Sequence, residues 1–193
     1  MSRGDVPVKH WLAIGGALLG SFMAILDIQI TNSSLKDIQA ALGATLEESS
    51  WIATSYLVAE MIAIPLTGFF AAWLSPRRYL LWNTTGFIIS SLLCSFAWNL
   101  ESMIVFRAMQ GFTGGALIPM AFTLILQLLP LEKRPLGMAL FGVTATFAPS
   151  IGPTLGGWLT EAFSWHYIFY LSVIPGVVVL WLLAEGLDKQ PGD

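Results

Sequence analysis

The sequence predicts an all-α membrane protein with six transmembrane helices, and three observations carry this prediction. Charged residues make up only 11% of the 193 residues, whereas an ordinary soluble domain carries roughly 25%. Hydrophobic residues make up 55% and gather in six apolar stretches, each close to the roughly 20 residues that a helix needs to cross a bilayer. Polar and apolar residues do not alternate along these stretches, so helices are favoured over the strands of a transmembrane barrel.

The predicted spans follow one another with short connections. They are Trp11–Thr31, Trp51–Trp73, Tyr79–Ala97, Met103–Leu124, Leu136–Leu159 and Trp165–Ala184. All 8 tryptophans fall near a predicted end, where indole rings settle at a membrane–water interface. The expected organisation is a cytoplasmic segment at 1–10, a six-helix domain at 11–184 and a cytoplasmic tail at 185–193.

Lysine and arginine predict the orientation. With six spans, seven basic residues fall on the side of the two termini, and Lys36 is the one basic residue in a loop on the other side. The seven are Arg3, Lys9, Arg77, Arg78, Lys133, Arg134 and Lys189. The positive-inside rule then places both termini in the cytoplasm. We expect a multi-pass protein of the inner (plasma) membrane, with the lipid bilayer as its first partner.

Three charged residues lie inside predicted spans: Asp27, Glu60 and Arg107. A charge at that depth costs several kcal/mol on insertion scales, so it is expected to face a cavity or a partner. Asp27 and Arg107 lie at similar depths, each roughly 6 Å from the outer end of its span at about 1.5 Å per residue. They are expected to meet if the first and fourth helices are neighbours, as a functional pair or as a static ion pair that fixes packing. Glu60 lies nearer the middle of the second span.

Small residues and prolines mark two spans. Gly16 and Gly20 form a GxxxG pair in the first span, a spacing that lets another helix approach closely. The fifth span holds two prolines and three glycines within Ala148–Gly157. Proline removes a backbone hydrogen bond and bends a helix, and bent helices suit membrane proteins that rock between two states.

Four stretches carry a specific resemblance. They are Leu26–Leu35, Trp51–Gly68, Arg107–Gly115 and Ala148–Gly157. The last resembles the antiporter signature GxxxGPxxGG of the major facilitator superfamily, with Ala148 in place of its first glycine. The third is similar to that superfamily's fourth-span motif RxxQGxG, and the first two resemble the opening spans of its drug–proton antiporters. The match covers nearly the whole chain and is closest to the fourteen-span multidrug-efflux branch.

The sequence departs from the family pattern in a few places. The loop after the second span usually reads GxxxDRxGRR, but here Ala72 stands at the acidic position and only Arg77 fits after Gly68. The usual charged latch between the two halves is therefore not expected. Gln29 replaces a usual threonine and Lys36 a usual proline. Where the family typically reads NVPIG, residues 172–176 read SVIPG, so the proline, Pro175, lies one position later.

The resemblance implies one major-facilitator half built from two inverted three-helix repeats. It also implies proton-coupled multidrug efflux by alternating access, in which a lipophilic, often cationic compound leaves as protons enter. The pKa of a buried aspartate depends on its solvation and on nearby cations, so Asp27 and Arg107 suit such coupling. The site residues expected on this basis fall into three groups: Asp27, Arg107 and Glu60 for proton coupling; Gln29, Thr31, Asn32 and Gln110 in the substrate cavity; and Gly152, Pro153, Gly156 and Gly157 in the antiporter motif.

Family members have two such halves, so three alternatives stay open: a fragment, a truncated product, or a half that pairs with a missing C-terminal half or a second copy. A non-transporting membrane scaffold or assembly factor is a further alternative. An enzyme is not expected, because His10 and His166 lie near opposite membrane faces and no HExxH or GxSxG motif is present. The single cysteine, Cys94, fits packing, and neither metal, cofactor nor nucleic acid is expected.

Overall fold

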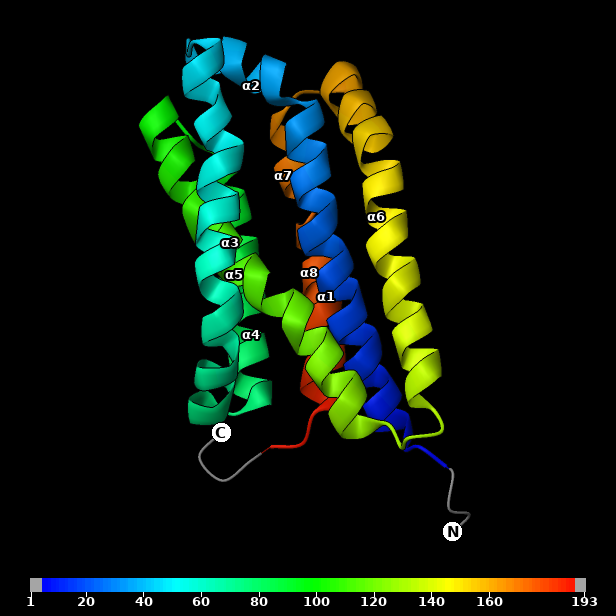
Figure 1. The fold of residues 1–193 in the computed structure, drawn as a ribbon. Coiled ribbons are helices and arrows are strands. Elements are labelled where there is room, and N and C mark those ends of the chain that lie inside the picture. The colour runs from blue at the N-terminus through cyan, green and yellow to red at the C-terminus, as the bar shows by residue number, and fades with distance from the viewer. Residues whose placement is uncertain (1–4, 190–193) are drawn as a thin grey trace.

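The computed structural model describes residues 5–189, which form a bundle of helices (Figure 1). The helices are α1 (Val8–Ser33), α2 (Leu35–Leu42), α3 (Leu46–Leu74), α4 (Pro76–Ser95), α5 (Leu100–Leu128), α6 (Arg134–Ala162), α7 (His166–Tyr170) and α8 (Val173–Gly186). No strand occurs within residues 5–189. The all-α prediction is confirmed.

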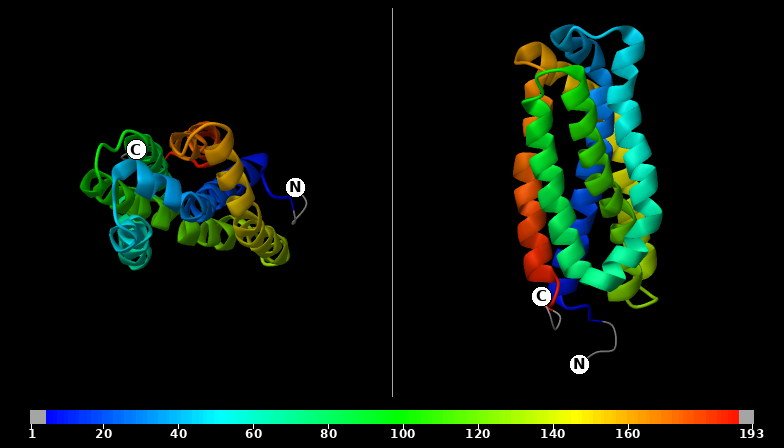
Figure 2. Two further views of the ribbon diagram at one scale, coloured as in Figure 1. Left: turned by 90° about the horizontal axis from the view of Figure 1, so that it is seen from above. Right: turned by 90° about the vertical axis from the view of Figure 1, so that its left-hand side faces the viewer.

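Five helical segments of the described chain are long and apolar enough to cross a membrane: α1, α3, α5, α6 and the combined stretch of α7 and α8. The remaining long helix, α4, has 20 residues, which span roughly 30 Å at the α-helical rise. It packs beside α5 and α8 in the bundle (Figure 2). Its apolar character is diluted by inward-facing polar residues such as Thr84 and Ser91, which donate to the carbonyls of Leu80 and Phe169.

Helices α3 and α5 begin before the predicted apolar spans because polar caps add turns to them. Helix α3 begins at Leu46, before the predicted Trp51, where Thr45 and Glu48 form a capping box. The Thr45 N–H donates to a Glu48 carboxylate oxygen at 2.8 Å, and the Glu48 N–H donates to Thr45 Oγ1 at 3.2 Å. Such a box satisfies two free donors at a helix start. Helix α4 begins at Pro76 and ends at Ser95, close to the predicted Tyr79 and Ala97.

Two local features differ from the predicted spans. A short helix, α2, lies between the first two spans where a loop was expected, with Ile38 buried beneath it. Helix α2 ends at Leu42 and is followed by Gly43, whose φ of 64° is left-handed and suits glycine. The last span, predicted as one helix, is divided into α7 and α8 at Leu171–Ser172. Pro175 has no N–H to donate to the carbonyl of Leu171 four residues earlier, and this weakens the helix at that point.

The packing of the long helices follows a repeated arrangement. Helix α1 packs against α6 and α8, and helix α5 packs against α3 and α4. Helices α1 and α5 meet between these two groups. Exchanging α1 with α5, α3 with α6 and α4 with α8 therefore reproduces the neighbour pairs. This exchange is what two inverted three-helix repeats produce.

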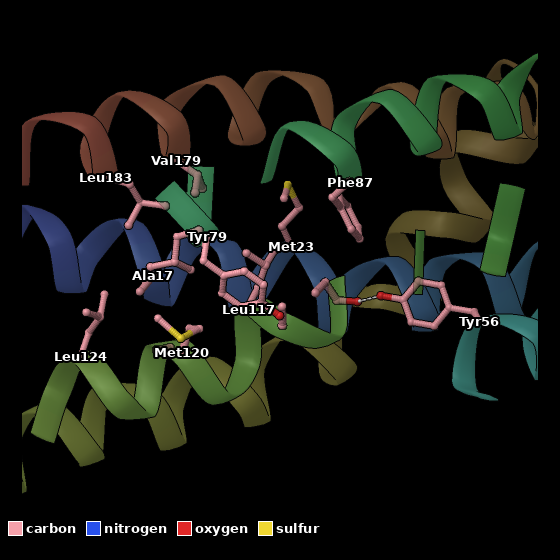
Figure 3. Close-up of a cluster of buried hydrophobic side chains, with 14 residues drawn as sticks. Ala17, Met23, Tyr56, Tyr79, Phe87, Leu117, Met120, Leu124, Val179 and Leu183 are labelled. Atoms are coloured by element: carbon pink, nitrogen blue, oxygen red, sulfur yellow. Dashed lines mark hydrogen bonds between the residues drawn. The ribbon is translucent and has the colours of Figure 1, made fainter. Parts of the chain in front are cut away.

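A cluster of buried side chains joins the helices at the centre of the bundle (Figure 3). Met23 of α1, Phe87 of α4 and Leu117 of α5 meet there. The ring of Tyr56 closes one end of the cluster, and its hydroxyl donates to the carbonyl of Ala24 at 3.3 Å. Tyr56 thus ties α3 to α1 through a buried polar contact beside an apolar core.

Both described chain ends lie at the same end of the bundle (Figure 1). Lys9 Nζ pairs there with Asp188 Oδ1 at 3.2 Å. The connections from α3 to α4 and from α5 to α6 lie at that end too. It therefore carries the described basic residues on the predicted cytoplasmic side, which are Lys9, Arg77, Arg78, Lys133, Arg134 and Lys189. Arg3 lies outside the described residues.

Candidate functional site

Helices α1 and α5 bring Asp27, Arg107 and Gln110 into one buried cluster. Arg107 Nη1 donates to Asp27 Oδ2 at 2.6 Å and to Gln110 Oε1 at 2.6 Å. Gln110 Nε2 donates to Asp27 Oδ1 at 3.1 Å. The side chains of Arg107 and Asp27 are 1% and 2% exposed. Both carboxylate oxygens of Asp27 thus accept a hydrogen bond from α5.

Two more helices complete the surroundings of Arg107. Its Nε donates to the Ile52 carbonyl of α3 at 3.3 Å, and its Cζ lies 4.4 Å from the centre of the Tyr56 ring, a cation–π distance. From α4, Cys94 Sγ donates to Gln110 Oε1 at 3.6 Å. Four helices therefore meet at this charge pair.

Close helix contacts hold Arg107 in this place. Gly111 and Gly115 of α5 face Tyr56 and Glu60 of α3, which repeat at the same four-residue spacing. A Cβ on Gly111 would overlap the Tyr56 carbonyl, and one on Gly115 would lie 3.0 Å from Glu60 Cα. Small residues at this spacing let two helix backbones approach. The α3–α5 approach brings the Ile52 carbonyl and the Tyr56 ring within reach of Arg107.

A buried ion pair is costly to form and more costly to break. Removing two charges from water costs several kcal/mol per ion, which close pairing and further hydrogen bonds offset. Here the Gln110 amide and the Ile52 carbonyl supply those further bonds. Chemically, the cluster is suited to hold or release one proton at the Asp27 carboxylate, with Arg107 as its counter-charge.

Glu60 lies apart from this cluster. It is 9% exposed and sits on α3, one turn beyond Tyr56. Within residues 5–189, its carboxylate makes no hydrogen bond or ion pair that would link it to Arg107. The structure therefore groups Asp27 with Arg107 and leaves Glu60 as a separate acidic group beside Gly115.

The four residues expected in the substrate cavity occupy different surroundings. Gln110 is buried inside the charge cluster. Thr31 is also buried, and its Oγ1 has no hydrogen-bond partner among the described residues. Gln29 is half-buried against Gly152, and Asn32 is exposed. The structure does not bring these four side chains together.

The antiporter motif divides into buried and open positions. Helix α6 continues without a break through Pro149 and Pro153. Gly152 and Gly156 are buried against α1, where a Cβ on Gly156 would lie 3.0 Å from Ile30 Cα. A Cβ on Gly157, by contrast, would meet nothing within 4 Å in the described chain. Pro153 is exposed. The glycines at 152 and 156 therefore set the α1–α6 approach.

Some parts of the cluster depend on how the helices pack against one another and were not predicted from the sequence. Gln110 lies three residues after Arg107, one helical turn along, and this spacing is the signal that would have paired them. The contribution of the Ile52 carbonyl had no signal in the side-chain pattern. The ring of Tyr56 became part of the site only through the glycine contacts of α5.

Comparisons with known proteins agree on one family. The family described as "Major Facilitator Superfamily" matches residues 17–192. The "Colistin resistance protein EmrB" of Acinetobacter baumannii is 47% identical over 176 residues, which are 91% of this chain and 34% of that protein. The "Probable multidrug resistance protein EmrY" of Escherichia coli is 41% identical over 93% of this chain and 36% of its own length. The chain thus spans about a third of the length of these curated relatives.

A solved structure described as "Crystal structure of D-xylose-proton symporter" has the same fold over 90% of this chain and 47% of its own. The TM-score is 0.76 at 16% sequence identity. At this identity the likeness concerns the arrangement of helices alone.

Proposed function

Since the chain belongs to the Major Facilitator Superfamily, we propose that it forms the amino-terminal half of a proton-coupled multidrug efflux antiporter. Its similarity to proteins named for multidrug and colistin resistance supports this proposal. The two halves would rock about a central cavity and expose it to one side of the membrane at a time. The other half is a missing C-terminal segment or a second copy of this chain.

The observation that carries the proposal is the buried cluster of Asp27, Arg107 and Gln110. Asp27 holds α1 against α5 through two hydrogen bonds that need its carboxylate oxygens as acceptors. A proton on Asp27 cancels the negative charge and removes one of these acceptors, so Arg107 loses its counter-charge. The α1–α5 contact then weakens. Proton binding at one carboxylate is in this way converted into a change in helix packing.

A lipophilic cation is the substrate class that fits this chemistry. Once Arg107 is displaced, a cationic substrate competes with the proton for the Asp27 carboxylate, and antiport follows from that competition. Burial in apolar surroundings suits the lipophilic part of the compound. Glu60, at the middle of α3 and one turn beyond Tyr56, supplies a second acidic group for the proton or the drug.

The distribution of basic residues supports an orientation. Lys9, Arg77 and Lys133 lie at the end of the bundle that holds the chain ends. By the positive-inside rule, that end faces the cytoplasm. The protein then sits in the inner membrane with both termini inside.

Proton exchange tests the proposal directly. The complete transporter that contains this chain is reconstituted in liposomes holding a trapped pH dye, and a lipophilic cation such as ethidium is added outside. Antiport predicts that cation entry drives protons out and raises the internal pH. Cation movement without proton movement would refute coupling, and the absence of both would favour a scaffold.

A further inference from the structure

A second polar site lies far from the charge cluster, at the end of the bundle that holds the chain ends. A cavity of about 210 Å³ opens there between α1, α4, α5 and the end of α8. Its polar lining consists of His10, Arg77, Gln127 and Asp188, and the remaining walls are mainly apolar. Three of these four side chains carry hydrogen-bond donors, so the cavity is suited to a ligand rich in acceptors.

Two nitrogens of this lining are buried without a partner among the described residues: His10 Nδ1 and Arg77 Nε. The other side of the Arg77 guanidinium is engaged, since Nη2 donates to the Ala184 carbonyl at 3.3 Å. That contact holds the guanidinium beside the C-terminal end of α8. A buried polar atom without a partner is uncommon and costs free energy. Arg77 Nε always carries a hydrogen, so it indicates a ligand that supplies an oxygen atom, and His10 Nδ1 adds a second donor in the tautomer that protonates it.

The backbone brings helix ends of both signs to the same place. Helix α1 begins at Val8, two residues before His10, and its start has no side-chain cap. Helix α4 begins at Pro76, which lines the cavity, but Ser75 already caps this start by accepting from the Arg78 N–H. Helices α5 and α8 end at the cavity, so the negative ends of their dipoles offset the helix starts. The preference for an anion is therefore carried by the side chains of the lining.

The one acidic group of the lining is already neutralised. Asp188 Oδ1 pairs with Lys9 Nζ at 3.2 Å, so its charge is compensated at the rim. What faces the interior is a guanidinium, an imidazole and an amide. Tetrahedral oxyanions bind well to such donors because arginine offers a planar fork of N–H groups.

We propose that this cavity binds a phosphate anion, carried by a membrane lipid headgroup or free in solution. The cavity lies where the spans end, which is the depth of lipid headgroups. The apolar residues beside the polar lining, such as Leu124 and Leu128, suit the start of an acyl chain. A bound phosphate would join α1, α4 and α8 at their ends.

Lipid and phosphate binding to the purified full chain in maltoside detergent tests the proposal. Native mass spectrometry measures retention of dioleoyl phosphatidylglycerol, with dioleoylglycerol as the phosphate-free control, and thermal unfolding measures binding of inorganic phosphate. Arg77→Gln is expected to weaken phosphatidylglycerol binding about tenfold, as for loss of a charged hydrogen bond. Arg134→Gln is the matched control, because Arg134 lies at the same end and also donates to one carbonyl, that of Leu129.

His10→Phe removes both ring nitrogens without removing a fixed charge, and it is expected to weaken binding severalfold while the protein stays monodisperse. This variant keeps the test informative if Arg77→Gln fails to fold. Lipid binding without phosphate binding would assign the site to headgroups, and binding of both would show that the anion suffices. Equal affinity for dioleoylglycerol, or equal losses in the Arg77 and Arg134 variants, would overturn the proposal.

Discussion

Arg107 Nη1 lies 2.6 Å from Asp27 Oδ2 and joins α5 to α1 across 80 positions of sequence. Neither side chain is more than 2% exposed. Because Gln110 binds both of them, the three side chains act as one unit. The pair is therefore a structural contact, and the proposed function requires that proton binding to Asp27 switch it.

Truncation of Arg107 alone is predicted to destabilise the protein more than neutralising both members of the pair together. Arg107→Ala leaves a buried carboxylate without its counter-charge, which costs about 3–5 kcal/mol. Asp27→Asn with Arg107→Gln replaces the ion pair by neutral amides and is expected to recover expression without restoring proton coupling. Thermal unfolding in detergent, followed by size-exclusion chromatography, measures the difference. Arg134→Ala is the control, and an equal loss in this variant would contradict the prediction.

Neighbouring glycines of the antiporter motif are predicted to respond differently to a large side chain. Gly156→Leu pushes against the α1 backbone at Ile30 and is expected to cost about 1–3 kcal/mol by overpacking. Gly157→Leu projects into space that no described residue fills, so the stability of the chain is expected to change little. The same unfolding assay compares the two variants.

The Gly157 position also bears on the whole transporter. The sequence alone predicts that either leucine harms transport. If Gly157→Leu leaves the chain stable but stops efflux in the complete transporter, the open face of α6 contacts the other half. Normal efflux with Gly156→Leu would argue against a role for the α1–α6 contact.

Cysteine labelling tests the orientation. Cys94 is fully buried, so the native chain is expected to react slowly with a membrane-impermeant maleimide. Ser50→Cys, at the end of the bundle opposite the chain ends, should label in intact cells. Glu132→Cys, in the exposed connection before α6, should label only after permeabilisation. Labelling of residue 132 in intact cells would invert the topology.

Much of the fold could be predicted because hydrophobicity is a local property. Five of the six apolar stretches lie in the long helices α1, α3, α4, α5 and α6, and the sixth forms the segment of α7 and α8. Their ends could not be placed from apolarity, since caps such as Thr45 with Glu48 add polar turns. Helix α2 has only eight residues and is too short for a span signal. The division between α7 and α8 follows from one missing N–H at Pro175, which composition does not reveal.

The site could be predicted in part. Similar depth and opposite charge were enough to expect that Asp27 and Arg107 meet, because a charge in an apolar span needs a partner. The helix faces were harder to assign. Gln110 was expected in the substrate cavity but lies between the paired charges, and Glu60 lies outside them. Which face of α5 meets α3 depends on the close approach at Gly111, a tertiary contact.

In the proposed function, Asp27 is the proton-responsive carboxylate of the transporter. The most direct measurement compares Asp27→Asn with Asp37→Asn, an identical change on the exposed surface of α2. Each complete transporter is reconstituted at equal protein level, and cation efflux is recorded against an imposed pH gradient. We expect Asp37→Asn to respond to the gradient like the unmodified protein, and Asp27→Asn to lose the response while still binding the cation in part. Gradient-driven efflux by Asp27→Asn at the unmodified rate would contradict the claim and assign the proton site to another group, with Glu60 next to be tested.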